Sequence, residues 1–277
     1  MMYNAISRLM DIRTVLVYPT RVNGAHVFEA LAIGAIGMSI LTLGLFAIDD
    51  RTLAGEPVWL KPFKFALSFA ILFATLGFAA GRLSETWRRS RLIVTSGAAA
   101  GAAFSFEMSY IAAQAARQEA PHFNESTPFH TAMHGLMGHG ATALMATIAV
   151  VGVVVWSDRE ARLGQGLRLG LGLGFLLTTV LTSWVAGELA GNGGRYVGVP
   201  SDAHARLPLL GWSMEIGDLR PAHFLALHAM QVLPLAGHLA DRNGSSVRSF
   251  WMAAVLCAIL TTLIFHQALR GIPLISA

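Results

Sequence analysis

Four of the ten histidines in the chain lie within residues 121–140, and histidine is well suited to binding a metal or haem near neutral pH. This stretch begins as a polar loop and continues into an apolar segment that ends near Trp156. Histidine is uncommon inside a membrane unless it has a partner or a function. The pair Thr127-Pro128 is typical of a helix start and predicts where the apolar segment becomes helical.

The histidines of this segment do not all share one helix face. His130 and His134 are four residues apart and point the same way, whereas His139 lies about 140° around the helix from His134. At most two of the three can therefore contribute to one site. Small residues lie beside them, namely Gly135, Gly138 and Gly140. Such glycines suit either the close approach of a flat macrocycle or close helix packing.

Ionisable residues on four further apolar segments fall near the same depth as His134. At about 1.5 Å per residue, each lies within roughly two turns of the outer end of its segment. These residues are Glu107, Glu188, His228 and His266. Glu107 also begins a polar helix face that continues through Tyr110 and Gln114 to Arg117. Burying ionisable groups is costly, so their agreement on one depth predicts a functional polar layer.

The first functional hypothesis is a membrane redox protein that binds haem b. Two neutral imidazoles would face each other across the haem, with His134 or His139 on one segment and His228 on another. Cations that could bind the propionates are Lys61, Lys64 and Arg117. No Cys-x-x-Cys-His motif is present, which excludes a covalently attached haem. The expected partners are membrane lipid and a quinone or small apolar substrate.

The second hypothesis is a metal-dependent membrane enzyme. His134, His228 and His266 would bind Zn²⁺ or iron, and Glu107 or Glu188 would act as the general base on a lipid or small apolar substrate. A proton-coupled transporter is the third hypothesis. The choice between an oxidoreductase, a hydrolase and a carrier stays open, as does the oligomeric state.

Composition defines the broad class. Of the 277 residues, 54% are hydrophobic and 13% are charged, whereas soluble domains carry about 25% charged residues. The mean hydropathy is +0.56. These values predict an all-α polytopic membrane protein. The net charge of +4 comes mainly from arginines that flank the apolar segments, which indicates membrane orientation and not nucleic-acid binding. The single cysteine, Cys257, cannot form an intrachain disulfide.

Seven segments are long enough to span a membrane, at about 20 residues each. They cover roughly 27–48, 61–81, 92–115, 129–156, 168–190, 222–240 and 248–269. Arginines are more frequent at one set of segment ends, which predicts a cytoplasmic N-terminus and an external C-terminus in a bacterial inner membrane. We expect one membrane domain over 1–277, with 1–24 as an interfacial tail and 191–221 as an external loop. Glycines in the third and fifth segments predict close helix packing.

Two motifs resemble uncharacterised bacterial multi-pass membrane proteins. They are E-P-V-W-L-K-P-F-K-F at 56–65 and P-H-F-N at 121–124. The resemblance covers two of the seven segments and one loop, and it implies a membrane fold without any activity. Seven segments also invite comparison with membrane ceramidases and adiponectin-receptor-like hydrolases, which hold zinc with three histidines. The chain departs from them, because its last segment contains only His266 and no His-x-x-x-His pair.

Overall fold

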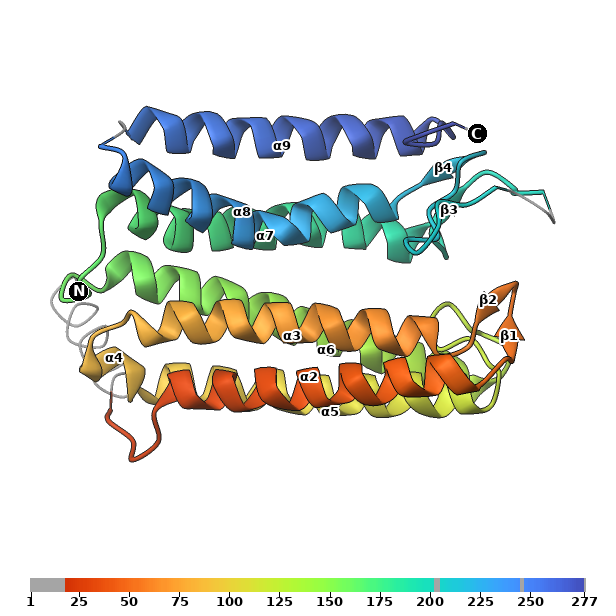
Figure 1. Ribbon diagram of the computed structural model, residues 1–277, viewed down its shortest axis with the longest axis horizontal. Coiled ribbons are helices and arrows are strands. Elements are labelled where there is room, and N and C mark those ends of the chain that lie inside the picture. Colours follow the sequence, from red (N-terminus) through yellow and green to blue (C-terminus); the bar gives the residue numbers. More distant parts are fainter. Residues whose placement is uncertain (1–17, 202–204, 245–246, 277) are drawn as a thin grey trace, which may run out of the picture. The chain divides into compact units, whose positions relative to one another are not determined.

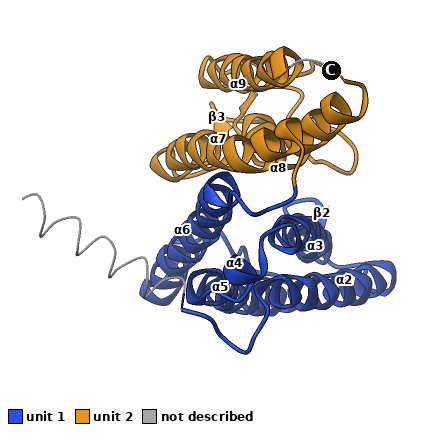
Figure 2. Ribbon diagram, turned by 90° about the vertical axis from the view of Figure 1, so that its left-hand side faces the viewer, with its two compact units in different colours: residues 1–162 blue, residues 163–277 orange. Residues whose placement is uncertain are grey.

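The computed structural model describes residues 18–201, 205–244 and 247–276. The chain forms two compact units, Met1–Arg162 and Leu163–Ala277, coloured separately in Figure 2, and each is described by itself. Most of the interfacial tail expected over 1–24 and residues 202–204 of the expected external loop lie outside the described residues. The expectation of one membrane domain over the whole chain stays a prediction.

Unit 1 is built from long helices that run side by side (Figure 1). They are α2 (Gly24–Ile48), α3 (Leu60–Gly81), α5 (Arg91–Ala116) and α6 (Pro128–Ser157), with a short α4 (Glu85–Arg88) before α5. A small antiparallel hairpin of β1 (Thr52–Leu53) and β2 (Glu56–Pro57) connects α2 to α3. Helix α2 packs on α3, α5 packs on α6, and α3 also contacts α5.

Side-chain caps explain where three of these helices begin. Asn23 accepts a hydrogen bond from the backbone N–H of Ala25 at the start of α2. Ser90 caps α5 in the same way, and Thr127 accepts from the N–H of His130 at 3.2 Å with Pro128 in the first turn of α6. Each cap satisfies a donor that the helix itself leaves unpaired. The predicted start of α6 at Thr127-Pro128 is confirmed.

Unit 2 consists of three mutually packed helices and a small hairpin. The helices are α7 (Gln165–Gly191), α8 (Arg220–Arg242) and α9 (Val247–Leu269). Strands β3 (Tyr196–Val197) and β4 (Gly217–Asp218) pair antiparallel between α7 and α8. Helix α8 continues without interruption through Pro234. The hairpin brings the two ends of the predicted external loop together beside the start of α8.

Glycines bring the backbones of α7 and α8 into contact. A β-carbon added at Gly166 would lie 2.3 Å from the carbonyl oxygen of Gly237, and one added at Gly170 would lie 2.5 Å from Cα of Pro234. Any larger residue at these positions would separate the helices. Asp241 of α8 also accepts hydrogen bonds from the N–H groups of Gly166 and Leu167, at 2.7 and 2.8 Å. This carboxylate therefore caps α7 from the neighbouring helix.

Glycines also allow two helices of unit 1 to pack closely. A β-carbon at Gly97 would lie 2.9 Å from Val27, and one at Gly101 would lie 3.1 Å from Leu31, so α5 packs closely on α2 through its Gly-x-x-x-Gly pattern. The close packing predicted from the glycines of the third and fifth segments is confirmed. Small residues are the usual contact residues between membrane helices, because lipid provides no hydrophobic force that drives helices together.

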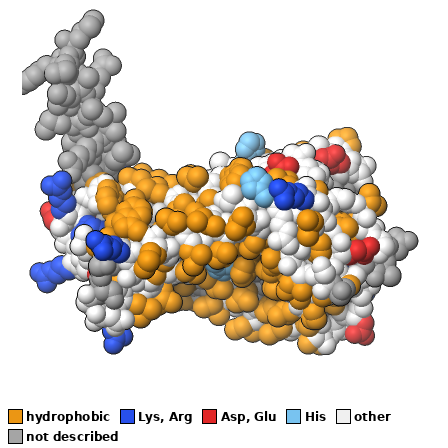
Figure 3. All heavy atoms as spheres, turned by 90° about the horizontal axis from the view of Figure 1, so that it is seen from above, with side chains coloured by type: hydrophobic (Ala, Val, Ile, Leu, Met, Phe, Trp, Pro, Cys, Tyr) orange, Lys and Arg blue, Asp and Glu red, His pale blue; other side chains and the backbone are white. Residues whose placement is uncertain are grey.

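Within the part of the chain that the structure describes, six helices have the length and apolar composition needed to cross a membrane, namely α2, α3, α5, α6, α7 and α9. Large apolar side chains lie exposed on them, such as Ile33, 71% exposed, and Met252, 66% exposed. In Figure 3, hydrophobic side chains cover much of the middle of one face, and charged side chains lie mainly toward its ends. Lipid would cover such surfaces. The chain therefore has the character of an integral membrane protein.

All seven predicted helical segments are present as helices. The apolar composition supports six of the seven predicted membrane spans, because α8 is not among the six apolar helices. Helix α8 carries His223, His228, Gln231 and His238 in addition to charged residues at both ends. These polar residues lower its hydropathy, although it is as long as α9.

Replacing Gly170 with alanine should destabilise unit 2. The added methyl group would overlap the backbone of α8 at Pro234, and overpacking of this kind costs about 1–3 kcal/mol. We expect a clear fall in the melting temperature of the detergent-purified protein. Gly187→Ala is the matched control, because nothing lies within 4 Å of a β-carbon at that position of the same helix. Equal melting temperatures for the two variants would contradict the close contact.

Candidate functional site

His228 of α8 is the predicted site residue with the most ligand-like surroundings in unit 2. Its half-buried imidazole packs against the ring of Phe224, with the ring centres 4.2 Å apart. Phe224 in turn contacts Trp212 of the preceding loop at 5.6 Å. The loop thus contributes an aromatic side chain to the shell around this histidine. Aromatic and apolar shells limit the access of water to a bound cofactor.

A hydrogen bond sets the tautomer of His228. Its Nδ1 lies 3.2 Å from the amide oxygen Oε1 of Gln231. An amide oxygen only accepts hydrogen bonds, so Nδ1 carries the proton and Nε2 carries a lone pair. Histidines that bind metals typically donate the N–H of their other ring nitrogen to an oxygen in this way. His228 therefore presents Nε2 in the form that a metal or haem iron requires.

His223 is a neighbour of His228 that the sequence analysis did not select. Its Nδ1 is fully covered and has no hydrogen-bond partner among the described residues. The two imidazoles are close enough for their charges to interact. The only signal in the sequence was a second histidine five residues before His228 on the same helix.

The loop before α8 is fixed by a buried ion pair. Asp218 is covered and accepts hydrogen bonds from Arg220 and from the backbone N–H of Ser213, the latter at 2.9 Å. Arg220 also donates to the carbonyl oxygen of Gly211 at 2.6 Å. Because these contacts bracket Trp212, they hold its indole beside Phe224. Helix α8 and the loop are thus one local structure around His228.

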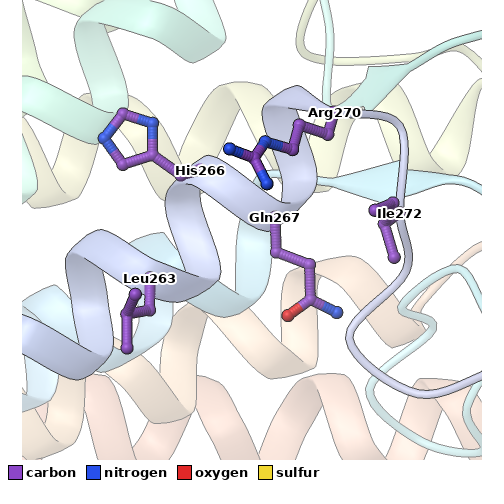
Figure 4. Close-up of a pocket in the computed structure, with 5 residues that line it drawn as sticks. All are labelled: Leu263, His266, Gln267, Arg270 and Ile272. Carbon is purple, nitrogen blue, oxygen red and sulfur yellow. The ribbon is translucent and has the colours of Figure 1, made fainter.

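His266 lies in different surroundings on α9. It is exposed and lines an open groove of about 480 Å³ with Leu263, Gln267, Arg270 and Ile272. Figure 4 shows His266 and Arg270 on one side of the helix, while Gln267 points away. Gln267 donates to the carbonyl oxygen of Pro273, which folds the chain end back onto α9. A groove with one imidazole and one guanidinium would favour an anion over a metal cation.

The predicted metal set draws on both units. Within residues 18–201, 205–244 and 247–276, no three His, Cys, Asp or Glu side chains gather as metal ligands. Zinc or iron binding by His134, His228 and His266 stays a prediction. Glu188 is exposed near the end of α7, and its role as a general base also stays a prediction.

In unit 1, three of the four residues on the predicted polar face of α5 are buried. Glu107, Tyr110 and Gln114 are buried, whereas Arg117 is exposed and pairs with Glu119 at 3.2 Å. The carboxylate of Glu107 lies against α6 at Gly140. A β-carbon at that glycine would lie 3.0 Å from Oε1 of Glu107. The glycine therefore makes room for a buried carboxylate.

Lys61 and Lys64 lie in the first two turns of α3, and both are partly buried. The charge of Lys61 acts on the carboxyl group of Glu107 and on the imidazole of His122. Its ammonium group also lies 5.9 Å from the ring centre of Phe65. Lys61 therefore lies near Phe65, and its charge reaches Glu107 and His122. The predicted binding of haem propionates by Lys61, Lys64 and Arg117 stays a prediction.

The histidines of α6 differ from His228 in their hydrogen bonds. The backbone N–H of Phe123 donates to Nδ1 of His134 at 3.4 Å, which places the proton of a neutral ring on Nε2. Binding iron through Nε2 would require that bond to be given up. His130 pairs with Glu119 and the cap residue Thr127, so its role is structural. His139 is exposed, and its predicted ligand role stays a prediction.

The fold and these polar centres define an all-helical protein of the integral membrane class. Comparison of the chain with protein-family models, with curated proteins and with solved structures finds no match. We therefore infer the function from the geometry of the side chains alone.

Asp49 positions the start of α3 from the end of α2. It accepts hydrogen bonds from Arg51 and from the indole N–H of Trp59, the latter at 2.7 Å. The hydrogen bonds from Arg51 and Trp59 hold the pKa of Asp49 well below its ordinary value. Trp59 is buried against Val58 and Ala115. The contact thus fixes the segment that carries Lys61.

Replacing Asp49 with asparagine should lower the melting temperature in a pH-dependent way. The folded-state pKa is depressed, so the stabilisation is fully present above the unfolded-state pKa of about 4 and is lost as the pH falls below it. The difference between the wild type and Asp49→Asn should therefore be constant from pH 5 to 7 and shrink below pH 4. Asp50→Asn, at the adjacent exposed residue, is the control. A difference that grows at low pH would contradict this account.

Proposed function

We propose that the chain is an integral membrane redox protein that binds haem through His228. The observation that supports this proposal most strongly is the hydrogen bond from Nδ1–H of His228 to Gln231, which leaves Nε2 as the ligand nitrogen. Haem needs only one or two axial ligands from the protein, so a single well-oriented imidazole is sufficient to hold it. A zinc enzyme would need at least three ligands at one point.

The residues around His228 fit this role. Gln231 holds the imidazole in its ligand tautomer, and such hydrogen bonds also tune the electron density on a bound iron. Phe224 and Trp212 provide flat aromatic surfaces and keep water away from the imidazole. When bound, haem would supply one-electron transfer, with a potential set by its axial ligands and surroundings.

Mutation of His228 tests the proposal. His228→Ala removes the ligand nitrogen and should reduce the haem content of the purified protein at least tenfold, measured as pyridine haemochrome per chain. His238→Ala is the matched control, because it removes an exposed imidazole ten residues further along α8. That variant should keep the haem content of the wild type.

Two results would contradict the proposal. The first is full haem content in His228→Ala that retains the melting temperature of the wild type. The second is a haem-free wild-type protein that holds one zinc or iron per chain. The second result would instead favour the metal-dependent membrane enzyme with a lipid or small apolar substrate.

We also propose a topology for the chain. Helix α8 would also cross the membrane, which brings the number of spans to seven, with the N-terminus in the cytoplasm and the C-terminus outside, in a bacterial inner membrane. The arginines Arg82, Arg88 and Arg89 between α3 and α5 support this orientation, because positive residues in short loops favour the cytoplasmic side. Helices α7 and α9 both pack on α8, where its small apolar residues such as Ala226, Ala229 and Gly237 are buried.

Cysteine labelling in whole cells tests this topology. The only native cysteine is the buried Cys257, so Cys257→Ser provides a cysteine-free background. In that background, Asp50→Cys should react with a membrane-impermeant maleimide from outside. Arg88→Cys should react only after the cells are lysed. The opposite pattern would reverse the proposed orientation.

A further inference from the structure

Besides Nε of Arg88 in α4, two buried side-chain polar atoms in the described part of unit 1 have no hydrogen-bond partner. They are the hydroxyl oxygen of Tyr110, a residue only 7% exposed, and Nδ1 of His122. Neither finds a hydrogen-bond partner among the residues that the structure describes. More than 90% of buried polar groups in proteins are hydrogen-bonded, and an unpaired one costs about 1–3 kcal/mol. Two such atoms in one region indicate a ligand that completes their hydrogen bonds.

The two residues share a neighbour. The ring of Phe65 lies 5.2 Å from the imidazole of His122, and it also packs against the buried cluster of Tyr110, Ile111 and Met137. The start of α3, the end of α5 and the start of α6 lie together at one end of unit 1 (Figure 1). The unpaired hydroxyl and the unpaired imidazole thus belong to one local structure formed by these three helices and the loop before α6.

The charges around this structure favour a hydrogen-bond acceptor as the ligand. Burial is the main cause that holds the pKa of His122 well below its ordinary value, and the charge of Lys61 acts in the same direction. His122 is therefore neutral at pH 7. The positive charge of Lys61 nearby would attract a carbonyl oxygen. Tyr110 donates through its hydroxyl, and neutral His122 donates through Nδ1 in the matching tautomer.

The remaining lining is apolar and aromatic. Phe65, Phe106 and Met133 pack against the cluster of Tyr110, Ile111 and Met137. Flat rings and flexible thioethers suit the faces of a planar ring. Phe123 of the adjoining loop is partly exposed, and its ring lies tilted against that of His134 with the ring centres 5.0 Å apart. A ligand that reaches this place from the membrane would combine a planar apolar ring with carbonyl acceptors and an apolar tail.

We propose that unit 1 binds the head group of a lipid-soluble quinone, with Tyr110 and His122 as hydrogen-bond donors to its carbonyl oxygens. Phe65 and Met137 contribute to the apolar surface around the ring. The proposal concerns binding alone and uses residues of unit 1 only. The proposed haem ligand His228 belongs to unit 2, so the two assignments can be tested independently.

Titration with decylubiquinone tests the inference. The detergent-purified full chain should bind it saturably, as measured by isothermal calorimetry at a fixed detergent concentration. Tyr110→Phe removes only the hydroxyl and should weaken binding about tenfold, the value of one lost hydrogen bond to a buried partner. Tyr18→Phe is the matched control, because its ring is exposed and contacts the guanidinium group of Arg91, and its hydroxyl group makes no hydrogen bond to the residues that the structure describes. It should bind like the wild type.

A second variant covers the other donor. His122→Phe keeps an aromatic ring beside Phe65 but removes both ring nitrogens, and it should also weaken binding about tenfold. Melting temperatures close to the wild type would show that both variants are folded. Unchanged affinity in Tyr110→Phe and His122→Phe would overturn the site, as would a wild-type protein without saturable binding. Haem content measured on the same samples shows independently whether the haem proposal holds.

Discussion

A lipid bilayer offers no water to its buried polar groups, so every polar side chain inside a membrane helix needs a partner in the protein or in a ligand. Several hydroxyl groups meet this requirement locally, as Ser39 and Thr261 do by donating to carbonyl oxygens one turn earlier, whereas those of Thr178 and Thr182 find no partner among the described residues. Helix ends meet it through side chains from elsewhere, as Asp241 does for α7. Tyr110 and His122 are the departures from this pattern on which the ligand assignment in unit 1 is based.

Close backbone packing makes room for the polar residues that remain. The glycines of α7 allow α8 to approach at Gly237 and Pro234, which anchors a helix that is too polar to be held by lipid alone. With α8 anchored, Gln231 and Phe224 can orient His228 at fixed positions on the same helix. In unit 1, Gly140 leaves the space that the carboxylate of Glu107 occupies. Small residues thus help to position the ionisable groups that were predicted to be functional from the sequence.

The positions of the helices could be predicted closely, because an apolar run of about 20 residues is typical of a membrane-spanning helix. The sequence predicted that α7 starts at residue 168. The helix starts earlier, at Gln165, because Asp241 of α8 caps it there. Hydrogen-bond partners of the histidines could not be predicted, because they depend on side-chain geometry. His134 and His228 looked equivalent in the sequence, but a backbone N–H faces one and an amide oxygen faces the other. The covered Nδ1 of His122 was also hidden, since its packing partner Phe65 lies on a distant segment.

The most direct test of the central claim is an absorption spectrum of the detergent-purified protein, first oxidised and then reduced with dithionite, with iron measured on the same sample. The account predicts a Soret band that shifts and sharpens on reduction, with about one iron per chain. A colourless protein that contains no iron, purified from cells supplied with haem, would contradict the assignment of His228 as a haem ligand.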